Sequence, residues 1–208
     1  MKNGRVINST VVADVDSIIF RPASSVTDEG IVINGIKWAT RNVGAPGTFV
    51  ANPTDPGMLY QWNSTTGWSS TDPLVSTNGS VWHYSWNGNG ATTWETKNNV
   101  CPQGWRMPTK AEFDNLLTVT SKSWTTIPAA GYIFSVYGKT LFLPAAGFRD
   151  GAAGGMLSLA GEEGHYWSST VGDITSPNYS YFLRFSSDGA NTFDFNRNKG
   201  ASCRCVAE

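Results

Sequence analysis

Residues 100–113 form a short stretch, VCPQGWRMPTKAEF, that is typical of a turn leading into a capped helix. Thr109 is a good N-cap residue, and Glu112, three positions later, can return a hydrogen bond to the cap amide. Apolar residues follow at helical spacing and predict a helix over residues 110–119. A second stretch, SCRCV at residues 202–206, indicates a strand. Both stretches contain cysteine, so we expect the end of the chain to return to its middle.

The chain has three cysteines, Cys101, Cys203 and Cys205. An odd count leaves at least one thiol free. A bond from Cys101 to either of the others would close a loop of about a hundred residues, worth roughly 4–5 kcal/mol in the chain-entropy model. Cys203 and Cys205 lie two apart on a predicted strand, which is too stretched for them to bridge each other easily. The alternative is three buried thiols.

Composition narrows the class of protein. Charged residues make up only 15% of the chain, whereas aromatic residues make up 12%. The chain contains nine tryptophans and 22 glycines. This balance favours many loops with large aromatic anchors over a helical bundle. The net charge is −1, without a basic stripe, so we expect no nucleic-acid partner. No apolar run reaches the roughly 20 residues needed to span a bilayer, and no apolar segment of a signal peptide follows the first basic residues.

The order of local signals predicts two units. Residues 1–28 are expected to be an N-terminal strand and linker segment, and residues 29–208 a single larger domain. Asn34 and Gly35 predict a hairpin turn, and Gly138 separates two expected strands within residues 131–144. Residues 44–99 are expected to be long ordered loops held by tryptophans, with a short helix near residues 56–62. Further strands are expected at residues 166–169, 180–186, 192–196 and 202–206.

Five stretches in this order resemble the Fibrobacter-succinogenes-type major paralogous domain, which is abundant in Bacteroidetes. They are residues 38–44 (WATRNVG), 57–62 (GMLYQW), 101–109 (CPQGWRMPT), 166–169 (YWSS) and 204–206 (RCV). The resemblance covers about residues 30–208, and the family is similar to C-type-lectin-like folds. It implies an α+β, C-type-lectin-like domain with mixed or antiparallel strands, one or two helices and long ordered loops. It also implies that the segment between Trp167 and Gly200 is a display surface.

Catalytic and metal chemistry are disfavoured by the residues present. The formylglycine-generating relatives of this family bind copper with two cysteines several residues apart, whereas Cys203 and Cys205 are separated by one residue. No Gly-x-Ser-x-Gly motif occurs, and His165 is expected to be a packed or edge residue. The spacing of the cysteines and histidines does not match a zinc-binding motif. The short motifs around Asn178 and Asn196 lack the paired carboxylates that calcium favours. We therefore predict no catalytic residues, no metal and no cofactor.

The segment from residue 170 to residue 200 is rich in Asn, Asp, Ser, Thr, Tyr, Phe and Gly, and it lacks Trp, Met, Glu and Gln. Tyr, Ser, Gly and Asn are also the residues that antibody binding loops favour. Mutagenesis of adenine in AAY-type codons would yield the same composition, as in the variable proteins of diversity-generating retroelements. Strand alternation predicts Tyr181, Leu183, Phe185, Phe193 and Phe195 inward, with the intervening residues presented.

These observations predict a non-catalytic ligand-recognition module, an adhesin or receptor-binding protein with a variable C-terminal surface. Its partner would be a protein or glycan on another cell or particle, without membrane insertion, and its location the cell surface, the secreted fraction or a phage particle. The predicted ligand-binding residues are Asp173, Thr175, Asn178, Phe182, Arg184, Ser186, Asp194, Asn196 and Asn198. The alternatives are a structural cell-surface or pilus-associated module assembled through residues 1–30, and a copper-dependent oxidase of the formylglycine-generating type.

Overall fold

The computed structural model of the chain describes residues 27–152, 154–173 and 177–208. Strands hold 43% of them and helices 9%, with a single α-helix in this part of the chain. The expected α+β class is therefore wrong, because the fold is β-rich and is built from three sheets. The physical reason is that the one α-helix among the described residues is only ten residues long, while short strands carry most of the core. The strand expected in the N-terminal segment falls within residues 1–26, which lie outside the described residues.

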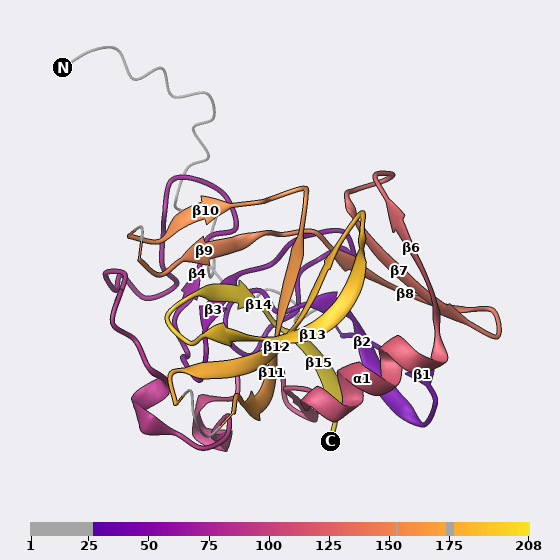
Figure 1. Ribbon diagram of the computed structural model, residues 1–208, viewed down its shortest axis with the longest axis horizontal. Helices are drawn as coiled ribbons and strands as arrows, with labels where there is room; N and C mark the ends of the chain where they lie inside the picture. Colours follow the sequence, from indigo (N-terminus) through magenta and orange to yellow (C-terminus); the bar gives the residue numbers. More distant parts are fainter. Residues whose placement is uncertain (1–26, 153, 174–176) are drawn as a thin grey trace, which may run out of the picture.

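The largest sheet has the strand order β10-β9-β14-β11-β12-β13, and β3 joins β14 to β4 beside this path (Figure 1). A second sheet has the order β1-β2-β15-β5, and a third has the order β6-β7-β8. The strands of the largest sheet are β3 (Leu59–Gln61), β4 (Gly67–Trp68), β9 (Phe148–Asp150), β10 (Met156–Ser158), β11 (Gly164–Val171), β12 (Tyr179–Ser186), β13 (Gly189–Asn196) and β14 (Gly200–Ser202). The others are β1 (Ile31–Ile33), β2 (Ile36–Asn42), β5 (Trp105–Arg106), β6 (Ser121–Thr125), β7 (Gly131–Val136), β8 (Lys139–Pro144) and β15 (Arg204–Ala207).

Local turn signals set two of the hairpins. Asn34 and Gly35 both have positive φ, at 46° and 81°, and they join β1 to β2 as the sequence predicts. Tyr137 and Gly138 do the same between β7 and β8. The helix expected near residues 56–62 is absent, because β3 forms there and pairs with β14 and β4. Most of the expected loop region is indeed irregular, with two short 3₁₀ turns, Gly88–Gly90 and Thr96–Asn98.

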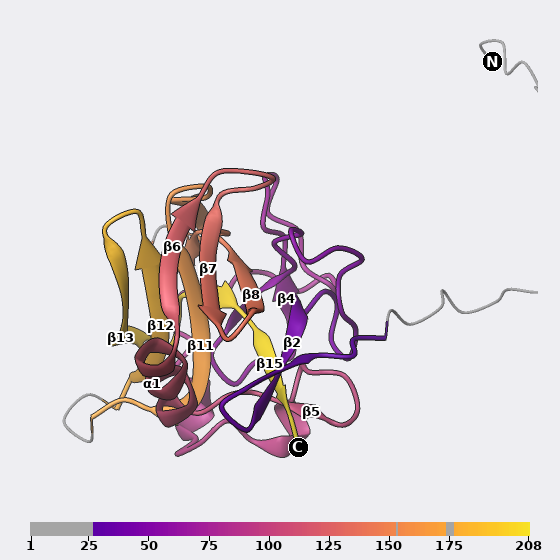
Figure 2. The same cartoon turned by 90° about the vertical axis from the view of Figure 1, so that its right-hand side faces the viewer.

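Helix α1 (Lys110–Val119) has the predicted bounds and the predicted capping box. The Thr109 hydroxyl accepts from the Glu112 amide at 3.2 Å, and the Glu112 carboxylate accepts from the Thr109 amide at 2.7 Å. Phe113 and Leu116 are buried and pack against residues of β7, β11 and β12. Figure 2 shows α1 lying against both the β6–β8 sheet and the β11–β13 strands.

Removing the cap gives a first test of this helix. Thr109→Ala should lower the free energy of unfolding by about 1 kcal/mol, the usual cost of a lost N-cap side chain. Thr118→Ala is the matched control, because Thr118 lies on the exposed side of the same helix and its hydroxyl bonds only the Asp114 carbonyl. Urea unfolding measures both variants. Equal losses would contradict a specific role for the cap.

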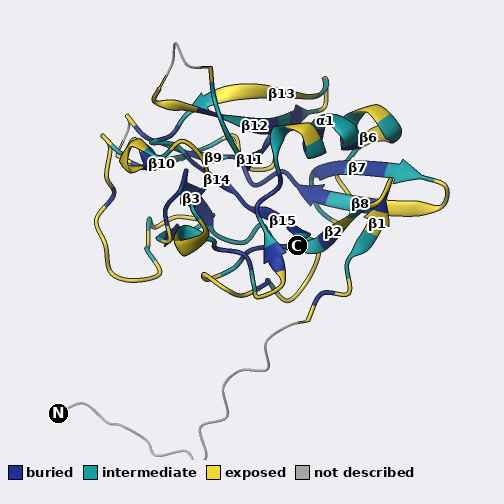
Figure 3. Cartoon of the chain, turned by 90° about the horizontal axis from the view of Figure 1, so that it is seen from below, coloured by how far each residue is buried: buried dark blue, intermediate teal, exposed yellow. Residues whose placement is uncertain are grey.

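The C-terminal end of the chain crosses between two sheets. Residues 202–206 do not form one strand, because β14 ends at Ser202 in the largest sheet and β15 begins at Arg204 in the second. β15 pairs with β2 on one side and with β5 on the other, through Val206 opposite Trp38 and Arg106. The end of the chain therefore returns to residues 105–106, as the sequence predicts. Both segments are fully buried except at Ala207 (Figure 3).

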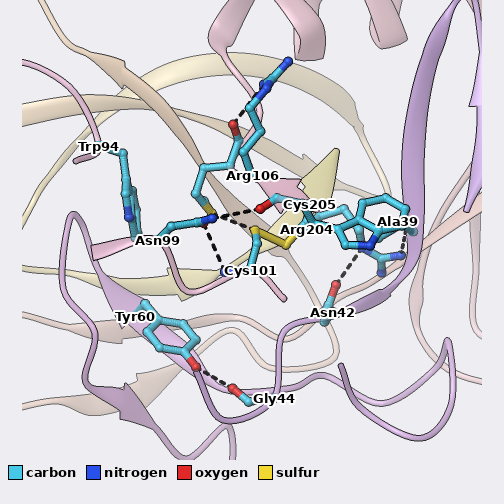
Figure 4. The surroundings of a disulfide bond; sticks show 12 residues. Ala39, Asn42, Gly44, Tyr60, Trp94, Asn99, Cys101, Arg106, Arg204 and Cys205 are labelled. Carbon is cyan, nitrogen blue, oxygen red and sulfur yellow. Dashed lines mark hydrogen bonds between the residues drawn. A yellow bond between two sulfur atoms is a disulfide. The ribbon is translucent and has the colours of Figure 1, made fainter. Parts of the chain in front are cut away.

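One disulfide joins Cys101 to Cys205, across a sequence separation of 104 residues, and Cys203 is free and buried (Figure 4). Arg204 lies beside the disulfide with no exposed surface, and it donates to the Asn42 side chain and the Ala39 carbonyl, both at 3.0 Å. The bond ties the start of the capped-helix stretch to the last strand. It resolves the pairing that the sequence leaves open.

Candidate functional site

Strands β12 and β13 form a regular antiparallel hairpin, from Tyr179 opposite Asn196 to Ser186 opposite Gly189. One face of this hairpin carries Leu183 and Phe185, which are buried against α1 and β7. β13 lies at the edge of the sheet and is mostly exposed or half-buried, as Figure 3 shows. The hairpin is therefore fixed through β12, while its edge strand β13 remains accessible.

The second face carries a packed group of aromatic rings. Phe182 stacks on Phe195 with ring centroids 4.6 Å apart and on His165 at 5.3 Å. Phe148 of β9 contacts His165 at 4.8 Å and Phe195 at 5.4 Å. Phe193, directly opposite Phe182, is 44% exposed at the margin of the group. These five residues, Phe148, His165, Phe182, Phe193 and Phe195, are called the aromatic cluster below.

The alternation prediction is partly wrong on this hairpin. Phe182 is 3% exposed instead of presented, and Tyr181, expected in the core, is half-buried. Phe193 and Phe195 were both expected to point inward. Phe193 is exposed and Phe195 is half-buried. The reason is that β12 is covered on both faces, by the aromatic cluster on one and by α1 on the other, so alternation alone does not identify the outer face.

Glu163 connects the aromatic cluster to an exposed cation. Its carboxylate accepts from His165 Nε2 at 2.8 Å and forms a two-pronged ion pair with Arg184. The Arg184 hydrogen bond is the main cause that lowers the pKa of Glu163. Burial lowers the pKa of His165 to about 4, so its ring is neutral at pH 7. The side chain of Arg184 remains 42% exposed, and the ion pair holds its guanidinium in one orientation.

A hollow of about 300 Å³ lies beside this arginine. The predicted site residues Arg184 and Ser186 line it, together with Asn191 and Phe193, which sequence reasoning did not select. The remaining lining residues, Asp188, Gly189 and Ala190, come from the turn and the start of β13. These residues define the hollow called the hairpin hollow below. Pairing across the β12–β13 register is the signal that places Asn191 beside Arg184.

Two other predicted site residues, Asp173 and Asn178, line a separate hollow of about 410 Å³ that also contains Arg197. Thr175 lies outside the described residues. Asp194 is exposed on the face opposite the aromatic cluster, since it pairs with Tyr181. The nine predicted residues therefore do not form a single site.

Asn196 and Asn198 serve the turn after β13. The Asn196 side chain accepts from the Asn198 amide at 3.1 Å, and the Asn198 side chain donates to the Tyr84 carbonyl at 2.7 Å. Side-chain bonds of this kind are typical of Asx turns, and the run of Asn residues before Gly200 is the signal that indicates one.

The described residues contain no group of three or more His, Cys, Asp or Glu side chains that could hold a metal ion. The disulfide uses the sulfur of Cys205, so Cys203 and Cys205 do not form a thiolate pair in this structure. Burial raises the pKa of the Cys203 thiol well above its usual range. In the same part of the chain, no helix is long and apolar enough to cross a membrane.

A family described as a domain of unknown function, DUF8237, matches residues 118–206. The matched region begins in α1 and contains β6 to β14, most of β15 and all the lining residues of the hairpin hollow. It contains only part of the lining of the 410 Å³ hollow, because residues 87–92 lie outside the match. No curated protein and no solved structure gives a significant match to the chain.

Proposed function

We propose that this chain is a non-catalytic recognition module that binds a protein or glycan on another surface through the hairpin hollow. The observation that carries the proposal is Phe193, an aromatic ring 44% exposed beside an arginine that an ion pair already orients. Exposed aromatic and arginine side chains dominate the energy of recognition surfaces. Fixing them before binding reduces the entropy lost when the complex forms.

The support beneath the hollow favours the same function. Phe182 and Phe195 lie against each other under Phe193, and α1 covers the opposite face of β12. Ser186 and Asn191 add hydroxyl and amide groups that can adapt to different ligand atoms. A rigid aromatic base with adaptable polar groups at its rim suits binding. The Cys101–Cys205 disulfide supports placing the module outside the cell, where such bonds persist.

As a finer part of this proposal, the exposed residues of β13 and its turn are sites of sequence diversification. Asp188, Asn191, Phe193 and Asp194 are exposed and are not part of the buried hydrophobic core. Substitution there is expected to leave the fold intact. A near-identical repeat of the codons for residues 167–206 beside a reverse-transcriptase gene would support diversification, and its absence would contradict it.

The binding test uses the double variant Phe193→Ala/Asn191→Ala. Wild-type protein is applied to a glycan array and to cells of a bacterial panel, with and without protease or periodate treatment, which separates protein from glycan receptors. We expect the variant to lose at least tenfold in affinity for whichever receptor binds, because the exposed ring is removed. The melting temperature should stay within about 2 °C, since both positions are on the surface.

Tyr137→Asn is the matched control for loss of an exposed ring. Tyr137 is 99% exposed at the β7–β8 turn, outside the hairpin hollow, and Asn tolerates its positive φ of 46°. The control should bind as the wild type does. Equal affinity of the double variant and the wild type would contradict the proposed site.

A further inference from the structure

Arg197 follows β13 and is only 3% exposed, so its charge lies largely out of water. Its guanidinium lies over the ring of Trp62, with 4.3 Å between the guanidinium carbon and the ring centroid. Trp62 is itself fully buried in the core. The arginine is therefore held in a fixed place by a ring that cannot move away.

The hydrogen bonds of Arg197 all go to uncharged oxygens. Nε donates to the Tyr179 carbonyl at 3.2 Å and the Ser180 hydroxyl at 2.9 Å. Nη1 donates to the carbonyls of Asn87 at 3.2 Å and Ala91 at 3.0 Å. A guanidinium has five N–H donors, and these bonds use Nε and both hydrogens of Nη1. Within residues 27–152, 154–173 and 177–208, no oxygen accepts from Nη2.

The charge of Arg197 also has no counter-ion in this part of the structure. None of the ion pairs between described residues includes it, whereas the buried Arg149 pairs with Asp72 at 2.8 Å. Burial lowers the pKa of Arg197, which reflects the cost of keeping its charge out of water. A buried charge of this kind is stabilised when an opposite charge comes into hydrogen-bond contact.

The arginine lines the 410 Å³ hollow together with Ala91, Val171 and Pro177, which give it an apolar wall. Thr92 and Asn178, both exposed, add polar groups to the same wall. Asp173 lies in the lining as well and brings one negative charge. Because Asp173 repels any anion in the hollow, a singly charged ligand group is repelled less than a doubly charged phosphate.

From these contacts we propose that this hollow, the Arg197 hollow, is a binding subsite for a carboxylate group, which accepts both N–H bonds of Arg197 Nη2. The volume accommodates a group the size of one sugar or one amino acid. A uronic acid and the C-terminal carboxylate of a peptide present the same chemistry, and the apolar wall covers the rest of either. The subsite is distinct from the hairpin hollow and does not depend on ligand binding there.

Isothermal titration calorimetry measures binding, and thermal unfolding measures the melting temperature. Both use two pairs of probes at equal ionic strength. Glucuronate is compared with glucose, and N-acetylalanine with its methyl ester. We expect the acids to bind and the neutral partners not to bind. At ten times its Kd, a bound acid should raise the melting temperature by about 3–6 °C for a chain of this size. The acid with the lower Kd identifies the source of the carboxylate.

Three variants make the result specific. Arg197→Gln should abolish acid binding, and Lys97→Gln, which removes an equal charge from an exposed lysine, should leave it unchanged. Because Arg197 also holds the Asn87 and Ala91 carbonyls, its variant can fail to fold. Asn178→Asp keeps the arginine and adds a carboxylate to the wall, so it should weaken acid binding at least tenfold by repulsion and competition.

The proposal is overturned if the wild type does not distinguish acids from their neutral partners, or if Asn178→Asp binds them as tightly as the wild type does. Asp173→Asn tests whether the chain supplies its own carboxylate. We expect this variant to bind acids somewhat more tightly than the wild type, because a repelling charge is removed. Acid binding that occurs only in Asp173→Asn would show that Asp173 fills the subsite, and it would also overturn the proposal.

Discussion

Replacing both bonded cysteines, in Cys101→Ala/Cys205→Ala, should lower the free energy of unfolding by about 4–5 kcal/mol. The disulfide spans 104 residues, and a loop of that length removes much of the conformational freedom of the unfolded chain. This is a large share of the total stability of a single domain, about 5–15 kcal/mol. Urea unfolding with and without a reducing agent measures the effect, and the double variant should not respond to reduction.

Cys203→Ala is the matched control. Cys203 is as buried as Cys205 but is unpaired, so its replacement removes one buried sulfur and leaves the loop closed. We expect a loss of about 1 kcal/mol and a full response to the reducing agent. If Cys203→Ala removed the response to reduction and the double variant kept it, the pairing would be wrong.

The features that sequence analysis predicts correctly depend on short-range chemistry. The Thr109–Glu112 capping box and the Asn34–Gly35 turn need only neighbouring residues, so their signals survive in any tertiary context. The return of the C-terminus to residues 105–106 was also predictable, because cysteines mark both partners. The sequence does not show which cysteine bonds to Cys101, because Cys203 and Cys205 lie two residues apart and are both buried. The position of β15 in its sheet decides that Cys205, and not Cys203, bonds to Cys101.

The errors arise where distant segments decide the outcome. Residues 59–61 become a strand because β14, about 140 residues later, supplies its partner. Phe182 is buried because His165 of β11 and Phe195 of β13 stack on its ring, and nothing within β12 encodes their position. For the same reason, no local pattern distinguishes Arg197 from the other polar residues of its Asn-rich turn. Its burial over Trp62 depends on a segment 135 residues earlier.

The histidine at the centre of the aromatic cluster should make the protein sensitive to mild acid. His165 Nε2 contacts the Glu163 carboxylate, so the neutral ring carries its proton on Nε2. Its Nδ1 is buried without a hydrogen-bond partner among the described residues. Protonation would place a second N–H against Phe148, Phe182 and Phe195. Burial therefore lowers the pKa of His165 from 6.5 to about 4, and nearby Arg184 and Lys199 act in the same direction, against the attraction of Glu163.

The direction of the effect on stability follows from proton binding. Well above pH 6.5 the ring is neutral in both states and contributes no pH dependence. Between pH 6.5 and pH 4 the unfolded chain binds a proton that the folded protein does not, so stability falls as the pH falls. The full difference is about 3 kcal/mol, from the change between 6.5 and about 4. Between pH 6 and pH 5, above most carboxylate titrations, we expect a loss of about 1 kcal/mol from this group.

Urea unfolding of His165→Phe tests this expectation, because phenylalanine keeps an aromatic ring in the cluster and removes the titrating group. The variant should lose the stability change between pH 6 and pH 5, whatever its stability at pH 7. The chain has one other histidine, the exposed His83, and His83→Gln should keep the wild-type pH dependence. An unchanged slope in His165→Phe would show that His165 is not the titrating group.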